Sequence, residues 1–172
     1  PYVLINEVKN FGSHNLIAKL IKEYQRTADA SYKVDLRSAI TSTIDKAEVA
    51  TIVEDFENAD IIKPQDLRGW YRGLLANHHG QQAAWDWIRE DWDWLDKTVG
   101  GDMEFATFIT VTAGVFHTPE RLKEFKEFFE PKVNVPLLSR EIKMDTKVIE
   151  SKVNLIEAEK DAVNSAIAKA ID

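Results

Sequence analysis

The sequence predicts an all-α protein, an α-solenoid of stacked helix pairs of the HEAT or armadillo type with a long C-terminal helix. Apolar residues recur three or four positions apart along most of the chain, which is typical of amphipathic helices. Helix starts at Lys46, Gln81 and Pro119 lie 35 and 38 residues apart, close to the period of helical-repeat proteins. The segment from Leu138 onwards keeps one apolar side and is long enough to pack across several preceding helices.

Helix-start signals and apolar spacing together predict where the individual helices begin and end. Asp45 with Glu48 forms a capping-box pattern, and Thr118 before Pro119 combines an N-cap with a first-turn proline. Pro64 opens a further helix, and Asp102 follows two glycines as another N-cap. The expected helices cover residues 3–9, 14–29, 34–43, 46–57, 65–77, 81–98, 103–115, 119–130 and 138–171.

Residues 105–116 leave two structures open. Their threonine, valine, isoleucine and phenylalanine side chains are favoured in strands, so a strand is the alternative there. Asp102 before the segment and Thr118 after it favour a helix. We therefore expect a buried helix.

The segment from Gln81 to about Val99 is expected to form one continuous helix with a buried stripe. Its tryptophans and aliphatic residues recur at helical spacing, and the helix from Pro119 carries a phenylalanine cluster. Replacing a large buried aromatic residue such as Trp92 by alanine is expected to cost about 3 to 5 kcal/mol. The expected structural core comprises Trp85, Ile88, Trp92, Leu95, Phe125, Phe128 and Phe129.

Gly69 and Gly73 are four residues apart on an expected helix, between Leu67 and Leu74. Each glycine costs a helix about 1 kcal/mol relative to alanine. Close packing of another backbone against this face is the interpretation that explains both.

Composition argues for a globular protein and against two classes of partner. With 22 Lys and Arg against 29 Asp and Glu, the net charge of −7 disfavours nucleic acid and anionic membranes. The longest uncharged run, Phe105 to Phe116, is shorter than the roughly 20 residues that span a bilayer. The absence of cysteine suits a cytoplasmic location. We expect a single helical-repeat domain over residues 1–172, and the start at Pro1 suggests a C-terminal fragment of a longer chain.

No residue pattern predicts a catalytic or metal-binding residue. The adjacent His78 and His79 would point about 100° apart on a helix, so they do not converge on one ion. His14 and His117 have no ligand partner at helical spacing, and His117 suits a role beside the Thr118 cap. Interleaved acidic and basic residues, such as Asp86, Glu90 and Asp93 beside Arg89 and Lys97, are typical of a solvated helix surface.

One group suits a binding role. Arg68, Tyr71 and Arg72, beside the Trp70 ring, would fit a groove that receives an anionic or peptide group. They are the candidate substrate-path residues.

Several pieces taken in order resemble the C-terminal helical domain of M1-family zinc aminopeptidases, of the bacterial aminopeptidase N or lysyl aminopeptidase type. The likeness covers about residues 35–171 and fades towards Pro1. No single piece is diagnostic, and the shared order and spacing carry the resemblance. The pieces are Gln65-Asp66-Leu67, Gly73 to Asn77, Gly80 to Ile88, Trp92, Leu95, Phe116, Thr118 to Leu122, Phe125, Phe128-Phe129, Lys132, Arg140 to Ile142 and Val153 to Ile156.

The resemblance implies a helical solenoid that closes the active-site chamber of a parent enzyme and helps to gate or select peptide substrates. It implies zinc in that parent, and as partners the catalytic and other upstream domains together with peptide substrates. The family's His-Glu-x-x-His and Gly-x-Met-Glu-Asn motifs are absent from the 172 residues, so no catalytic residue and no cofactor are expected in this chain itself. The alternative is a free-standing helical-repeat scaffold that binds another protein.

Overall fold

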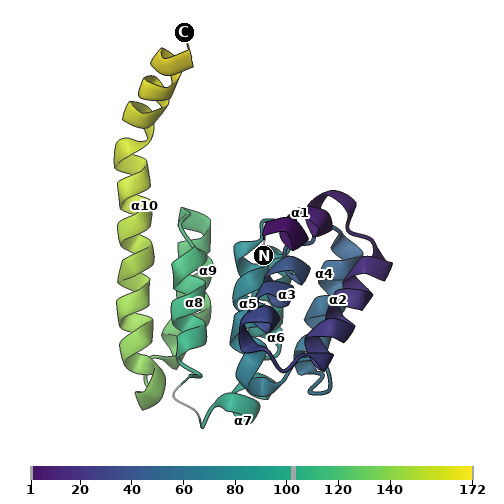
Figure 1. The fold of residues 1–172 in the computed structure, drawn as a ribbon. Coiled ribbons are helices and arrows are strands. Elements are labelled where there is room, and N and C mark those ends of the chain that lie inside the picture. The colour runs from purple at the N-terminus through teal and green to yellow at the C-terminus, as the bar shows by residue number, and fades with distance from the viewer. Residues whose placement is uncertain (1, 102–103, 172) are drawn as a thin grey trace. The chain divides into compact units, whose positions relative to one another are not determined.

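The computed structural model describes residues 2–101 and 104–171, and within those ranges the chain is all-α, without a strand. The contacts divide it into two compact units, residues 1–105 and residues 106–172. Within each unit the helices pack in pairs, which confirms the predicted fold class (Figure 1). The single domain over residues 1–172 remains a prediction.

The first unit contains seven α-helices and one short 3-10 helix among its described residues. The contacts pair α1 with α3, α2 with α3, α3 with α5, α5 with α6 and α4 with α6. The elements are α1 (Tyr2–Phe11), α2 (His14–Arg26), α3 (Ala30–Ile40), α4 (Lys46–Glu54), η1 (Asp55–Glu57), α5 (Pro64–Ala76), α6 (Gln81–Glu90) and α7 (Trp92–Val99).

Capping residues account for several helix boundaries. Ser13 caps α2 and Asp45 caps α4, each through its own side-chain oxygen. The expected helix over 14–29 ends earlier, at Arg26, because Asp29 accepts a hydrogen bond from Tyr32 N and starts the next helix at Ala30 instead of residue 34. The predicted capping box is only half formed, because the Asp45 N–H donates to Thr43 Oγ1 at 3.2 Å.

The prediction of one continuous helix from Gln81 to Val99 is wrong. Asp91 adopts φ −107° and ψ 24°, which ends α6 and precedes α7. Its N–H donates to Trp87 O while its own carbonyl accepts from Leu95 N, so one residue serves both ends. The break leaves Trp85, Ile88, Trp92 and Leu95 buried.

Aromatic rings fill the core of the first unit. Trp87 lies edge-on to Phe56, with ring centroids 4.8 Å apart, and its Nε1 donates to Glu57 at 3.2 Å. Trp92 contacts Phe105 at 4.8 Å, and Tyr24 lies edge-on to Trp70 at 5.0 Å. Edge-to-face pairs of this kind add about 0.5 to 1.5 kcal/mol beyond burial of their area.

The two glycines of α5 lie against α3, as expected from their spacing. A Cβ atom at Gly73 would lie 2.4 Å from Thr41 Oγ1, and one at Gly69 would lie 2.2 Å from an Arg37 guanidinium nitrogen. Thr41 is buried and β-branched, whereas the Arg37 head group ends a flexible side chain. The two glycines therefore differ in how well an added methyl group can be accommodated.

Gly73→Ala is expected to destabilise the protein by about 1 to 2 kcal/mol, because the overpacking at Thr41 exceeds the gain in helix propensity. Gly69→Ala is expected to cost less, since Arg37 can move aside. The control is Gly114→Ala at an exposed helix position, where an added Cβ would meet no described atom within 4 Å, and it is expected to stabilise by about 0.5 to 1 kcal/mol. Chemical denaturation of the three variants measures the order; equal stability of the Gly73 and Gly114 variants would contradict it.

The second unit is built around α10 (Pro136–Ile171), which packs on α8 (Thr107–Val115), on α9 (Pro119–Phe129) and on η2 (Glu130–Lys132). Thr118 caps α9 by accepting from Arg121 N, and Pro119 occupies the first turn, as predicted. Helix α8 replaces the strand alternative, although it begins at residue 107 rather than 103. The proposed cap Asp102 lies outside the described residues.

Candidate functional site

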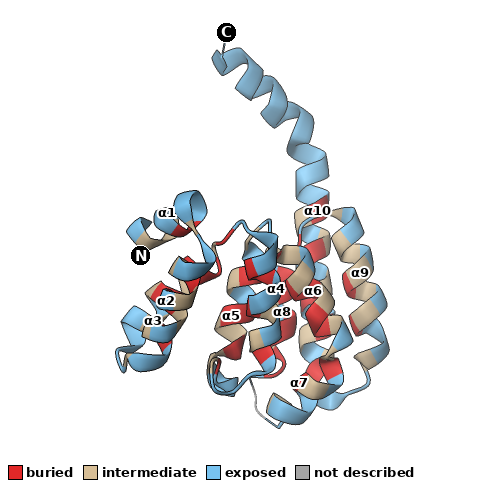
Figure 2. Ribbon diagram, turned by 90° about the vertical axis from the view of Figure 1, so that its right-hand side faces the viewer, coloured by how far each residue is buried: buried red, intermediate tan, exposed pale blue. Residues whose placement is uncertain are grey.

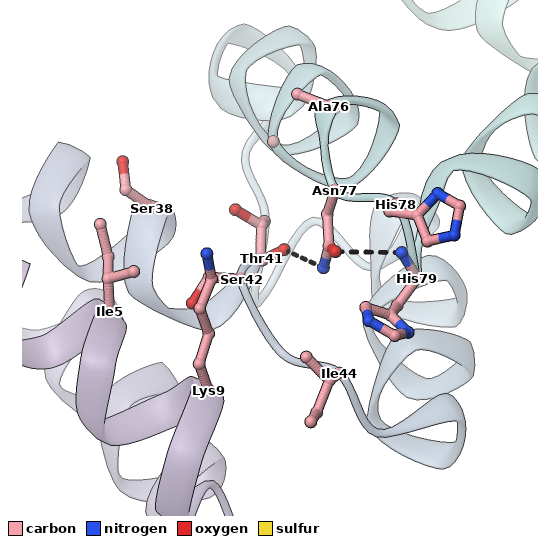
Figure 3. Close-up of a pocket in the computed structure, with 11 residues that line it drawn as sticks. Ile5, Lys9, Ser38, Thr41, Ser42, Ile44, Ala76, Asn77, His78 and His79 are labelled. Atoms are coloured by element: carbon pink, nitrogen blue, oxygen red, sulfur yellow. Dashed lines mark hydrogen bonds between the residues drawn. The ribbon is translucent and has the colours of Figure 1, made fainter. Parts of the chain in front are cut away.

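The candidate site is a pocket of about 560 Å³ in the first unit, formed by α1, by the C-terminal ends of α3 and α5 and by the turns that follow them (Figure 3). Its described lining includes the Lys9 ammonium, two histidines and several hydroxyl groups, but no carboxylate. The lining residues are Ile5, Lys9, Ser38, Thr41, Ser42, Ile44, Gly73, Ala76, Asn77, His78 and His79.

The Asn77 side chain connects the elements that form the pocket. Its side-chain nitrogen donates to Thr41 O at 2.9 Å (Figure 3). The same nitrogen donates to Thr43 O at 2.7 Å, so Asn77 connects the end of α5 to the end of α3. Its side-chain oxygen accepts from His79 N at 3.1 Å and forms the turn that presents both histidines. An asparagine directly after a helix signals a turn in the sequence. Its hydrogen-bond partners lie 34 and 36 residues away, and the sequence gives no signal for them.

Asn77→Ala is expected to lower the free energy of unfolding by about 1 to 3 kcal/mol, because two backbone carbonyls near α3 lose their donor. Asn10→Ala is the matched control, since the Asn10 amide bonds only to Asn6 O within its own exposed helix turn. Thermal or chemical unfolding measures both. Similar losses in the two variants would contradict the bridging role of Asn77.

The hydroxyl groups of the pocket are not set up as nucleophiles. Ser38 donates to Val34 O at 2.7 Å, Thr41 to Arg37 O at 2.9 Å and Ser42 to Ala39 O at 2.6 Å. Because each hydroxyl hydrogen points into a helix turn, the oxygen lone pairs remain as acceptors. The pocket can offer cationic and polar contacts to a ligand, and these contacts suit binding rather than bond cleavage.

The residues described by the structure contain no group of three or more His, Cys, Asp or Glu side chains placed to hold a metal ion. His78 and His79 are exposed, with ring centroids 5.6 Å apart and ring planes at 78°. The described residues therefore do not fit the zinc site that the resemblance implies for a parent enzyme.

The three candidate substrate-path residues of α5 do not come together. Tyr71 is fully buried, and its ring lies 6.0 Å from the Trp87 ring in the core. Arg68 is partly exposed and pairs with Glu104 at 3.7 Å, while Arg72 is exposed. The Tyr71 ring is enclosed in the core of this unit, and its substrate-path role remains a prediction. A substrate-path role for Arg68 and Arg72 remains a prediction.

The core residues named from the sequence differ in burial. Phe125 and Phe129 are fully buried and lie 4.7 Å apart, whereas Phe128 is half-buried beneath the Lys132 ammonium, 3.9 Å from its ring centroid. His117 Nδ1 lies 2.8 Å from Val115 O, beside the Thr118 cap.

A contact between His14 and Glu48 was not predicted from the sequence. His14 Nδ1 lies 2.8 Å from Glu48 Oε1, and the Glu48 side chain is nearly buried. The two residues are 34 positions apart, so helical spacing gives no signal for their contact. Glu48 therefore links α4 to the start of α2 instead of completing the capping box.

Asp145 is a buried carboxylate between α10 and α8. Burial raises its pKa and the neighbouring Glu141 raises it further, while the hydrogen bond from Thr110 at 2.8 Å and the charge of Lys152 lower it. Lys152 itself donates to Ala113 O and Gly114 O, both at 2.8 Å, at the end of α8. The net shift is upward, so burial dominates.

Because the folded pKa of Asp145 lies above its unfolded value, the resulting stabilisation is complete below the unfolded pKa and is lost as pH rises through the folded pKa. Asp145→Asn removes this charge and keeps an acceptor for Thr110. We expect the variant to be at least as stable as the wild type at neutral pH, with the difference shrinking towards acid pH. Urea unfolding across a pH series tests this; a variant that is much less stable at neutral pH would contradict it.

Packed helix pairs define the class of this chain, since the residues that the structure describes form an all-helical protein. The chain belongs to the ERAP1-like C-terminal domain family, which it matches over residues 2–151. This confirms the resemblance to the C-terminal helical domain of M1-family aminopeptidases.

Curated relatives agree with the family. The chain is 86% identical over all its 172 residues to an aminopeptidase N of Lactobacillus helveticus, of which it covers 20%. It is 58% identical over 99% of its length to an aminopeptidase N of Lactobacillus delbrueckii subsp. lactis, again covering 20%. With an aminopeptidase N of Lactococcus lactis subsp. lactis the identity is 36% over 96% of the chain and 19% of the relative. The chain thus spans about a fifth of the length of these relatives.

None of the described helices is both long enough and apolar enough to cross a membrane.

Proposed function

We propose that this chain is the non-catalytic C-terminal domain of a zinc-dependent aminopeptidase, and that it closes the active-site chamber and helps to gate or select peptide substrates. The observation that carries the proposal is the combination of 86% identity over the whole chain with coverage of only 20% of an aminopeptidase N. Zinc and the catalytic residues would belong to the remaining part of the longer polypeptide, in the cytoplasm. The length of the relatives favours this function over a free-standing scaffold.

The first experiment compares two proteins: the 172-residue chain and the full-length polypeptide expressed from the gene that encodes it. We expect the full-length polypeptide to hydrolyse aminoacyl anilides and to lose this activity when zinc is chelated. The 172-residue chain is expected to show no hydrolysis with or without added zinc. Zinc-stimulated turnover that copurifies with the 172-residue chain, or an inactive full-length polypeptide, would refute the proposal.

Substrate selection is tested on the exposed arginines of α5. In the full-length polypeptide, Arg68→Glu with Arg72→Glu is expected to change KM for longer peptides more than for an aminoacyl anilide, because only a longer peptide would reach this surface. Arg140→Glu with Lys143→Glu, both at exposed positions of α10, is the charge-matched control. Unchanged kinetics across peptide lengths would remove Arg68 and Arg72 from the substrate path.

A further inference from the structure

The first half of α10 has a buried face. Leu138, Ile142, Ile149 and Val153 are each at most 6% exposed, and Asp145 completes the same face. At 100° per residue these positions fall within about 80° of one another on the helix, and this face packs on α8 and α9.

The second half of α10 continues this face, and no described residue covers it. Every residue from 154 to 171 is exposed, and Figure 2 shows this part of the helix in the colour of exposed residues. The side that was buried nevertheless stays apolar, with Ile156 at 45%, Val163 at 51% and Ile167 at 53% exposure. Ile142, Ile149, Ile156 and Val163 follow one another at intervals of seven residues, so the register does not change where burial ends. We call Ile156, Val163, Ile167 and Ile171 the α10 stripe.

Two physical arguments indicate that the α10 stripe has an occupant in the complete protein. A helical segment of this length without tertiary contacts is marginal in water, since most helical stability comes from a packed apolar face. In addition, an apolar row that stays in register with an established intramolecular interface extends that interface.

The size of the α10 stripe distinguishes between two possible partners, a separate chain and another segment of the same polypeptide. From Ile156 to Ile171 it is about 22 Å long and about as wide as one helix, roughly 10 Å. This area is well below the roughly 800 Å² per partner that a stable complex between separate chains buries. A segment of the same polypeptide needs less, because its effective concentration is high and no second molecule is immobilised. Relatives five times as long as this chain provide such a segment.

We propose that the α10 stripe is the docking surface for the part of the longer polypeptide that lies outside residues 1–172. The inference rests on the proposed function, which supplies that longer polypeptide.

The charged residues within and beside the α10 stripe indicate the chemistry of the partner surface. Lys160 lies within the stripe, one turn after Ile156, so its aliphatic stem can join the apolar contact while its ammonium reaches outwards. Glu159 borders one edge, and Glu157 lies beyond the other. The partner surface is therefore an apolar groove with an acceptor for Lys160 and without carboxylates facing the glutamates.

Hydrogen exchange tests the proposal on the full-length polypeptide and on the 172-residue chain. Amides of residues 154–171 are expected to exchange at least tenfold more slowly in the full-length polypeptide. The triple variant Ile156→Ala, Val163→Ala and Ile167→Ala should remove this protection in the full-length polypeptide. Alanine has the highest helix propensity, so the loss cannot come from weaker helix formation. Asn154→Ala with Ser165→Ala, on the opposite side of the same helix, is the control and should leave protection unchanged.

Two results would overturn the inference: equal exchange in the two wild-type proteins, or protection in the 172-residue chain that rises with its concentration and so indicates a second copy. Aminoacyl-anilide hydrolysis by the full-length polypeptide separates the two proposals. Zinc-dependent hydrolysis without protection of α10 would leave the proposed function standing and remove the docking surface. Protection without hydrolysis would support the docking surface and remove the proposed function.

Discussion

Trp92→Ala is expected to lower the free energy of unfolding by about 3 to 5 kcal/mol. Trp92 is 8% exposed at the start of α7 and contacts the Phe105 ring at 4.8 Å, so its removal leaves a cavity and an unpaired aromatic neighbour. Guanidinium unfolding followed by circular dichroism measures the loss. The variant should keep its helical spectrum in buffer.

Trp94→Ala is the matched control, because Trp94 is in the same helix but only partly buried, 6.3 Å from the Trp87 ring. It should cost clearly less than Trp92→Ala. A Trp92 variant as stable as the wild type would show that this ring does not organise the core.

Phe125→Ala is the second large expected effect, at about 3 to 5 kcal/mol, in the unit that contains α8 to α10. Phe125 is fully buried and lies 4.7 Å from Phe129. Phe128→Ala is its control, since the half-buried Phe128 ring keeps one side towards the Lys132 ammonium and solvent. Equal losses in the two variants would contradict the burial difference.

Together the Trp92 and Phe125 variants also test the predicted single domain over residues 1–172. One shared unfolding transition that both variants lower would support it. Two transitions, each lowered by only one variant, would show that residues 1–105 and 106–172 unfold independently.

Local signals predicted much of the fold because they act within one helical turn. Thr118 and Pro119 start α9, Asp45 starts α4 and Gly73 allows close packing, each by the mechanism that the sequence suggested. Helix ends were less predictable. Asp91 interrupts the expected helix over 81–98 although neither glycine nor proline marks the break.

The candidate site was predicted less well, because its contacts join distant residues. Asn77 meets Thr41 and Thr43, and His14 meets Glu48, across more than 30 positions of sequence. Tyr71 stands beside Arg72 in the sequence, but the helix turns its ring into the core.

The sequence by itself determined the all-α class, most helix starts and the family resemblance, because periodicity, caps and ordered motifs are local properties of the chain. Tertiary structure alone decided which faces are covered. The apolar face of α10 keeps the same register from Leu138 to Ile171, yet burial ends after Val153 because α8 and α9 extend no further along the helix (Figure 1).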